Sequence, residues 1–199
     1  MPRASKVTDP SYELMDDHEG HSLIYRQHGF PSPLVRWHFH KEYELHLIVA
    51  SSGKVFIGDY IGNFAPDTLF LTGPNLPHNW ISQVEPDEVV ARRDMLVNFT
   101  DEVLEDGSGV FSELNRLAPL LARARYGIEF RDPALIGESR RLLQRIADSG
   151  GMLPVTEVCF ESGFSNLSNF NRRFQQLKGM TPTGYRRLVT QRLTEQNLL

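Results

Sequence analysis

Residues 155–187 run V-T-E-V-C-F-E-S-G-F-S-N-L-S-N-F-N-R-R-F-Q-Q-L-K-G-M-T-P-T-G-Y-R-R, and no other stretch constrains the fold of this chain as strongly. Apolar residues recur at helical spacing on both sides of Gly163, and Thr181-Pro182 begin another helix. Gly163 permits the turn between the first two helices, because glycine adopts positive φ at little cost. The pattern predicts a helix-turn-helix, which places its second helix in the DNA major groove.

The outward face of this second helix carries polar and basic side chains, which are the candidate DNA contacts. Ser165 or Asn166 can cap the helix N-terminus, where free N–H groups suit a phosphate. Arginine reads guanine and asparagine reads adenine through paired hydrogen bonds. The alternative without DNA binding is that this basic face of the helix is simply exposed to solvent. The candidate DNA-binding residues are Asn166, Ser168, Asn169, Asn171, Arg172, Arg173, Thr181 and Arg186.

Charge separates this module from the rest of the chain. Residues 152–199 carry six Lys and Arg against three Asp and Glu, a net charge of +3. The total of −4 therefore leaves −7 on residues 1–151. An acidic N-terminal part joined to a basic C-terminal module indicates that the two parts have different functions.

The part before this module changes its periodicity near residue 110. Short apolar runs at 44–50, 55–57, 68–71 and 95–99 are separated by Gly, Pro, Asn and Asp, which predicts a β-sandwich or small barrel. Helical spacing follows in residues 111–121, and Asp132 and Pro133 suit the start of another helix. We therefore predict an α+β chain with a β-barrel in residues 1–109, helices in 110–151 and a partial DNA-binding module in 152–199.

A histidine-rich cluster, W-H-F-H-K-E-Y-E-L-H at residues 37–46, is the densest candidate site in the first block. Its members of one parity would share a face of a regular strand, and a further histidine ends the segment G-P-N-L-P-H-N-W. Lys41 and Glu42 are expected in a solvated turn. The candidate effector-binding residues are His38, His40, Glu44, His46, His78 and Trp80.

Imidazole and carboxylate are sound ligands for a divalent first-row metal, and the metal candidates are His38, His40, Glu44 and His78. This spacing, H-x-H-x-x-x-E followed by a Gly/Pro turn and a His, resembles the cupin pattern. The resemblance implies a small barrel with these side chains pointing inward. The same groups could instead hydrogen-bond one another or a polar molecule, so no cofactor is expected to be required.

The C-terminal stretch resembles the second helix-turn-helix of the AraC/XylS family of bacterial transcription regulators. The resemblance rests on G-F-S-N, F-N-R-R-F, K-G-M-T-P and Y-R-R at their spacing in residues 154–187. It implies a cupin-type effector domain, post-barrel helices that pair subunits into a homodimer, and base-reading positions at Leu167, Ser168, Asn171 and Arg172. Leu167 departs from the pattern because it cannot hydrogen-bond.

One departure from the family concerns the whole module. Its members carry two helix-turn-helix units joined by a long helix, whereas residues 148–154 here run directly from the post-barrel helix into the second unit. We therefore expect a chain that lacks the first unit. The surviving unit would expose apolar side chains such as Val155, Phe160 or Leu177.

Three functions remain open. The first is a regulator that binds double-stranded DNA and senses a small polar effector, such as a sugar. The second is a cupin metalloenzyme, an isomerase or dioxygenase, although we expect no enzyme because an enzyme has no use for the basic helix. The third is a sensor and dimerisation module without DNA function. A single, core-type Cys159 and the lack of an apolar leader or membrane segment indicate a cytoplasmic protein.

Overall fold

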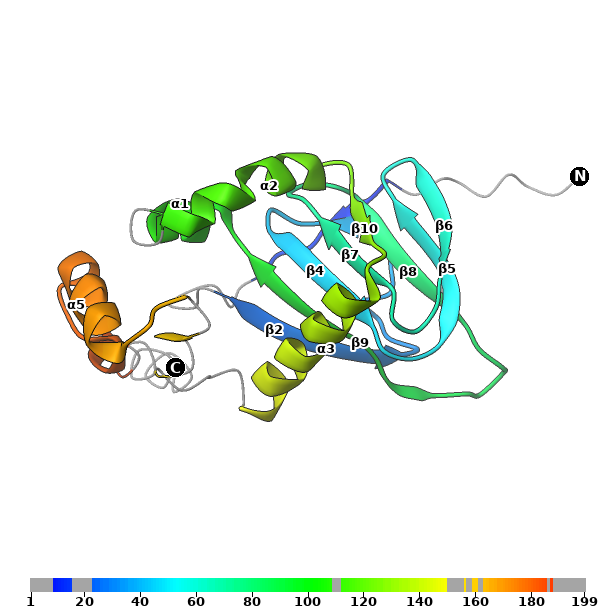
Figure 1. Ribbon diagram of the computed structural model, residues 1–199. Coiled ribbons are helices and arrows are strands. Elements are labelled where there is room, and N and C mark those ends of the chain that lie inside the picture. Colours follow the sequence, from blue (N-terminus) through cyan, green and yellow to red (C-terminus); the bar gives the residue numbers. More distant parts are fainter. Residues whose placement is uncertain are drawn as a thin grey trace, which may run out of the picture.

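The computed structural model describes residues 9–15, 23–108, 112–149 and 163–185, together with positions 156, 159, 160 and 187. Two five-stranded sheets face each other in its N-terminal part (Figure 1). Sheet A has the order β1 (Ser11–Tyr12), β3 (His38–Phe39), β8 (His78–Gln83), β5 (Ser52–Ile57) and β6 (Tyr60–Phe64). Sheet B has the order β10 (Ile128–Phe130), β7 (Leu69–Thr72), β4 (Tyr43–Ile48), β9 (Val90–Phe99) and β2 (Ile24–Phe30). The α+β class is confirmed, but the predicted barrel is a jelly-roll-like pair of sheets.

β4 is the central strand of sheet B, between β7 and β9, and its side chains alternate between the two faces of the sheet. Leu45 and Leu47 point to the outer face, where Leu47 joins a cluster with Leu69 and Met95. Glu44 and His46 point between the sheets, and both are buried. The outer face of β4 is therefore apolar, whereas its inner face carries Glu44 and His46 next to Ile48, which belongs to a buried apolar cluster with Val55, Phe70 and Trp80.

Helices cover the outer face and one end of sheet B (Figure 1). They are α1 (Asp101–Ser108), the 3₁₀ helix η2 (Ser112–Leu117), α2 (Ala118–Ala124) and α3 (Pro133–Asp148). The helix predicted over 111–121 is thus divided between η2 and α2, and α1 was not predicted. Asp132 caps α3 as expected, since its carboxylate accepts a 2.9 Å hydrogen bond from the Ala134 N–H. Ile136 and Leu143 of α3 pack into the cluster of Leu47.

The described C-terminal residues contain α5 (Leu167–Lys178). Asn166 caps this helix through a 2.8 Å hydrogen bond from the Asn169 N–H, and Gly179 ends it at φ 67°. Gly163 adopts φ 81°, which confirms the predicted turn. Thr181 Oγ1 accepts a 3.1 Å hydrogen bond from the Gly184 N–H, as expected of a cap.

Phe170 and Cys159 are buried, in agreement with the predicted apolar stripe and core cysteine. Within the described part of the chain, no helix combines the length and apolar character that crossing a membrane requires.

Candidate functional site

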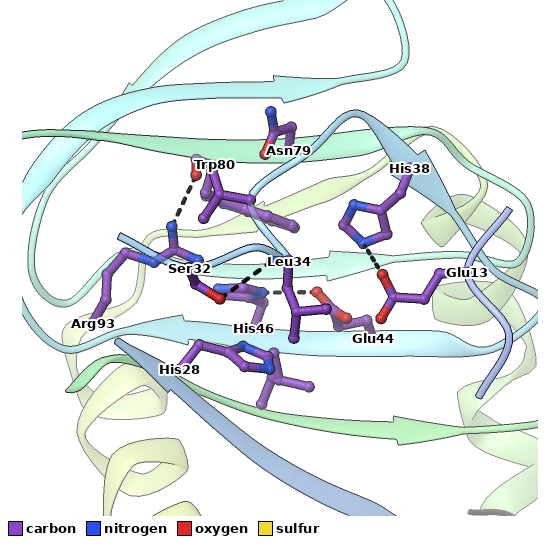
Figure 2. A pocket seen from close by; sticks show the side chains of 12 residues that line it. Glu13, His28, Ser32, Leu34, His38, Glu44, His46, Asn79, Trp80 and Arg93 are labelled. Carbon is purple, nitrogen blue, oxygen red and sulfur yellow. Dashed lines mark hydrogen bonds and ion pairs between the residues drawn. The ribbon is translucent and has the colours of Figure 1, made fainter. Parts of the chain in front are cut away.

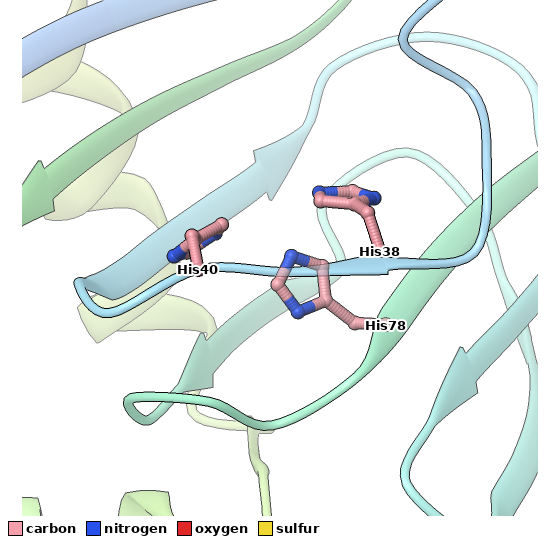
Figure 3. Close-up of side chains that lie close together, drawn as sticks. All are labelled: His38, His40 and His78. Carbon is pink, nitrogen blue, oxygen red and sulfur yellow. The ribbon is translucent and has the colours of Figure 1, made fainter. Parts of the chain in front are cut away.

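Three histidines meet between the two sheets (Figure 3). His38 on β3 and His78 on β8 are direct cross-strand partners, and His40 follows β3 in the next turn. One ring nitrogen from each histidine lies within 4.8 Å of the others, and all three residues are buried. We call His38, His40 and His78 the histidine triad.

Backbone carbonyls orient each ring of the triad. The three Nδ1 atoms lie 2.7 Å from Arg36 O, 3.1 Å from Glu42 O and 2.7 Å from Leu76 O, respectively. A carbonyl only accepts, so each Nδ1 donates, and in a neutral ring the Nε2 atom then keeps its lone pair. Among the described residues, the buried Nε2 atoms of His40 and His78 have no hydrogen-bond partner.

The protonation of the triad is set by burial and by Glu44. Burial lowers the pKa of His78 to about 3 and also lowers the pKa of His38. Burial would lower the pKa of His40 as well, but the nearby Glu44 carboxylate raises it above its ordinary value. At neutral pH His38 and His78 therefore present uncharged imidazole, the form that binds metals.

Glu44 borders the triad from β4 on the opposite sheet. Its Oε2 lies 3.3 Å from His40 Nε2, and its Oε1 lies 3.9 Å from His78 Nε2. Each oxygen also has a hydrogen bond elsewhere, because Oε1 accepts from His46 at 2.7 Å and Oε2 accepts from Asn98 at 3.1 Å. Burial would raise the pKa of Glu44, but the contacts with His40 and His46 bring it well below its usual value.

Figure 2 shows His46 hydrogen-bonded to Glu44, and the polar network continues from His46 to Asp94 on β9. His46 Nε2 lies 3.3 Å from Asp94 Oδ2, and the His46 ring stacks on Trp80 with centroids 4.0 Å apart. Burial would lower the pKa of His46, yet Asp94 and Glu44 raise it to about 9. Asp94 also pairs with Arg93 at 2.6 Å and with His28 at 3.1 Å. His46 is therefore a buried imidazolium between two carboxylates.

A cavity of about 30 Å³ adjoins the polar network of Glu44, His46 and Asp94. Its lining includes His38 of the triad and the neighbouring Glu44. Glu13 closes it from the N-terminal strand side, with its carboxylate 3.7 Å from His38 Nε2 and 3.2 Å from Arg36. Its lining residues are Glu13, His28, Ser32, Leu34, Val35, His38, Glu44, His46, Asn79, Trp80, Arg93 and Leu96. A site of this volume holds a water molecule or an ion.

The structure thus brings together all six predicted effector-site residues, but they come from different strands than the sequence suggested. His38 and Glu44 do not share a regular strand, because β3 and β4 belong to opposite sheets that face each other. The prediction for Glu42 was wrong: it is 1% exposed, and its Oε2 lies 3.5 Å from His40 Nδ1. Lys41 is exposed, as expected.

Sequence reasoning missed the partners on β9 and directly after the N-terminal strand β1. Asp94 and Asn98 are fully buried, and both point to the polar interior. The sequence feature that could have revealed them is their spacing: positions 94 and 98 lie on the same face of a strand, and both interrupt a run of apolar residues. Glu13 gave no comparable signal, because it follows β1, a strand of only two residues.

The donor set of the triad fits a divalent transition metal. Three imidazoles with ring nitrogens within 4.8 Å of one another, each fixed by a hydrogen bond from Nδ1, are the arrangement found in histidine metal sites. His38 and His78 are already neutral, and His40 would lose its proton to the metal, since metal ligands must be deprotonated. Glu44 is the carboxylate beside the triad, with its Oε2 3.3 Å from His40 Nε2, but its two oxygens already accept hydrogen bonds from His46 and Asn98.

The predicted DNA face lies on and beside α5. Ser168, Arg172 and Arg173 are exposed, whereas Asn169 and Asn171 are half-buried. Arg172 Nη2 donates a 2.9 Å hydrogen bond to Asn169 Oδ1. Asn166 and Thr181 are exposed and serve as caps. Leu167 is half-buried, and Arg186 lies outside the described residues.

Residues 128–188 match a family model described as a helix-turn-helix domain. This match supports the predicted helix-turn-helix in that part of the chain. It begins at Ile128 and therefore includes β10, which pairs with β7 in sheet B, and α3, which packs on that sheet.

The chain also aligns with solved structures. One is a variant of oxalate decarboxylase from B. subtilis, with 20% identity, a TM-score of 0.27, and coverage of 50% of this chain and 31% of that one. Another is a variant of apo ToxT from Vibrio cholerae, with 10% identity, a TM-score of 0.35, and coverage of 83% and 97%. The chain thus spans less than a third of the oxalate decarboxylase, and both TM-scores are low, so the assignment rests on the family match. A comparison with curated proteins gives no match.

Proposed function

We propose that this protein is a transcription regulator that binds double-stranded DNA through α5 and responds to a ligand held between its two sheets. One observation carries the proposal: the residues that match the helix-turn-helix family also form a capped helix with exposed Arg172 and Arg173. DNA binding would place the protein in the cytoplasm, because that is where its target duplex would lie.

The DNA contacts divide into two kinds on this proposal. Arg172 and Ser168 would face base edges, because they project from the first turns of the helix that enters the groove. The caps at Asn166 and Thr181 leave helix N-termini free for phosphate, and Arg186 would add a positive charge there. A single reading helix with few basic residues would bind nonspecific DNA with a Kd on the order of 10⁻⁴–10⁻⁶ M.

The ligand between the sheets is, on this proposal, a divalent transition metal held by His38, His40 and His78. Such a metal would supply a Lewis-acidic centre with open positions for an oxygen ligand. A sugar-like effector, predicted from the sequence, exceeds the cavity of about 30 Å³. A sugar would therefore require the segment around Ser32–Val35 to move away from the site.

The absence of a first helix-turn-helix unit remains a prediction. Phe160 is 57% exposed, in line with a unit that has lost a packing partner. Val155 lies outside the described residues, and nothing is described of the Leu177 side chain.

Fluorescence anisotropy tests the proposal directly. The full chain would be titrated onto the duplex upstream of its own gene and onto a scrambled duplex, at about 50 mM and about 200 mM salt. Each titration would be made with a chelator and with added Zn²⁺ or Mn²⁺. We expect preference for the natural duplex and a change of affinity with metal. Equal, salt-sensitive binding to both duplexes would reject sequence-specific regulation.

The histidine triad favours one alternative from another class, a metalloenzyme such as an isomerase or dioxygenase. The triad would leave metal positions open for a substrate, as well as for an effector. Metal-dependent turnover without DNA preference would support this reading. Metal binding with neither turnover nor DNA binding would instead indicate a sensor and dimerisation module.

A further inference from the structure

The four outer strands of the two sheets differ in how well they are protected against pairing with another chain. An edge strand exposes unpaired N–H and C=O groups, and proteins usually block it with charge, proline or shortness. β1 is two residues long. β10 has three residues, and its Glu129 forms a 2.8 Å ion pair with Arg131. β2 carries Arg26 and His28 and is followed by Pro31.

β6 has none of these devices. Its five residues, Tyr60–Phe64, read Y-I-G-N-F, without charge or proline. Ile61 is 66% exposed and Tyr60 is 44% exposed, although both are large apolar side chains. The strand lies at the rim of the molecule in Figure 1, at the end of sheet A. Among the described strands, β6 is therefore the unprotected edge.

The register of β6 shows which backbone groups are available. β5 and β6 form a two-residue hairpin closed by the Ile57–Tyr60 pair, with Gly58 at φ 57° in the turn. The closing pair of such a hairpin exchanges hydrogen bonds, and the pattern then alternates. The N–H and C=O groups of Ile61 and Asn63 consequently point away from β5, towards open space.

We propose that β6 pairs antiparallel with β6 of a second copy of this chain across a twofold axis. An uncharged strand is complementary to itself, since the same donors and acceptors return after a twofold rotation. Ile61 of each copy would then be covered. The described residues hold one DNA-reading helix, α5, whereas helix-turn-helix proteins read two half-sites as dimers. A second copy is therefore the occupant that the proposed function itself calls for.

The surface beside β6 fits this partner. A groove of about 190 Å³ adjoins the strand and is lined by Ile57, Tyr60, Phe70, Tyr126, Gly127 and Glu129. Tyr126 is 70% exposed, and its ring would gain cover from a neighbouring strand. Five residues of pairing bury less than the roughly 1,200 Å² of a stable interface, so the dimer should be weak and concentration-dependent in solution.

The test measures self-association without DNA, so its failure is distinct from failure of the proposed function. Sedimentation would follow the full chain from about 1 μM to about 200 μM, because association depends on concentration. We expect the mass to rise from 22.7 kDa towards twice that value. Ile61→Lys should weaken association at least about tenfold, since a charged edge blocks pairing.

The matched control is Val89→Lys, which makes the same chemical change at a 74% exposed residue outside the strands. It should associate like the wild type, and circular dichroism should show both variants folded. Hydrogen exchange should show slower exchange of the Ile61 and Asn63 amides at high concentration. The proposal is overturned if the wild type stays monomeric, or if Ile61→Lys dimerises normally. A dimer lost instead in Leu117→Lys would assign the interface to the post-barrel helices.

Discussion

His46 Nδ1 donates a 2.7 Å hydrogen bond to Glu44 Oε1, and both side chains are buried between the two sheets. The two residues stand two positions apart on β4, so they point to the same side of sheet B. Through this bond the carboxylate next to the histidine triad is tied to an imidazolium, and through it to Asp94. The candidate site is thus one connected polar network, in which a change at one group alters the charge balance of the others.

Replacement of His46 by alanine should destabilise the fold by about 3–5 kcal/mol. The substitution leaves Glu44 and Asp94 buried without the cation between them, and an uncompensated buried charge is costly. Urea unfolding at neutral pH would measure the loss. His28→Ala is the matched control, because this ring contacts Asp94 but is 20% exposed. A loss below about 1 kcal/mol for His46→Ala would show that the network is not an ionic one.

The pH dependence of stability should follow the same residue. The pKa of His46 rises from its ordinary 6.5 to about 9 in the folded state. Its contribution is therefore fully present below pH 6.5 and is lost as the pH rises through 9. Glu44 and Asp94 have lowered pKa values, so their contributions are present above 4.5 and 3.8 and are lost in acid. The free energy of unfolding should be greatest between these limits. A flat profile from pH 6.5 to 9 would contradict this assignment.

Metal binding should depend on the triad and not on the other histidines. Calorimetric titration with Zn²⁺ should show one site per chain, and His78→Ala should weaken it roughly 100-fold or more, by analogy with losses at supporting residues. His28→Ala should bind normally, because His28 lies outside the triad. Glu44→Gln distinguishes a ligand from a neighbour: it should weaken binding little if the three imidazoles suffice. Equal binding by wild type and His78→Ala would remove the metal from this site.

Local features of the fold were predictable from the sequence, whereas pairings between distant segments were not. Asp132 and Asn166 were expected as helix caps and are caps, because capping depends on a few consecutive residues. The positive φ of Gly163 was expected for the same reason. The separation of β3 and β4 into opposite sheets was not, because sheet partners are set by contacts far apart in the sequence.

The same division applies to the candidate site. His38, His40 and His78 were recognisable by residue type and spacing, and they do converge. Glu42 looked solvated because it follows a lysine in a turn, but the turn folds its carboxylate back towards His40. The burial of a turn residue depends on what packs over it, and no local pattern encodes that packing.

Loss of the α5 cap should weaken DNA binding without removing a base contact. Asn166→Ala removes the hydrogen bond to the Asn169 N–H, which should cost about 1 kcal/mol of helix stability. Affinity should therefore fall by a similar factor for the natural and scrambled duplexes, and Asn166→Asp, which can still cap, should restore the helix. Preserved affinity in Asn166→Ala would mean that α5 is held by its packing alone.

Arg172 should determine preference at one base position. Its guanidinium is exposed and is oriented by the 2.9 Å hydrogen bond to Asn169 Oδ1, which leaves its other N–H groups available to a guanine. Arg172→Ala should cost about 1–3 kcal/mol on the natural duplex and much less on a duplex with that base pair changed. Arg173→Ala provides the control, because it removes an equal positive charge from the neighbouring position. Any loss that comes only from weaker attraction to the phosphates should be the same in both variants. A uniform loss over all duplexes, with a shallower salt dependence, would instead make Arg172 a phosphate contact.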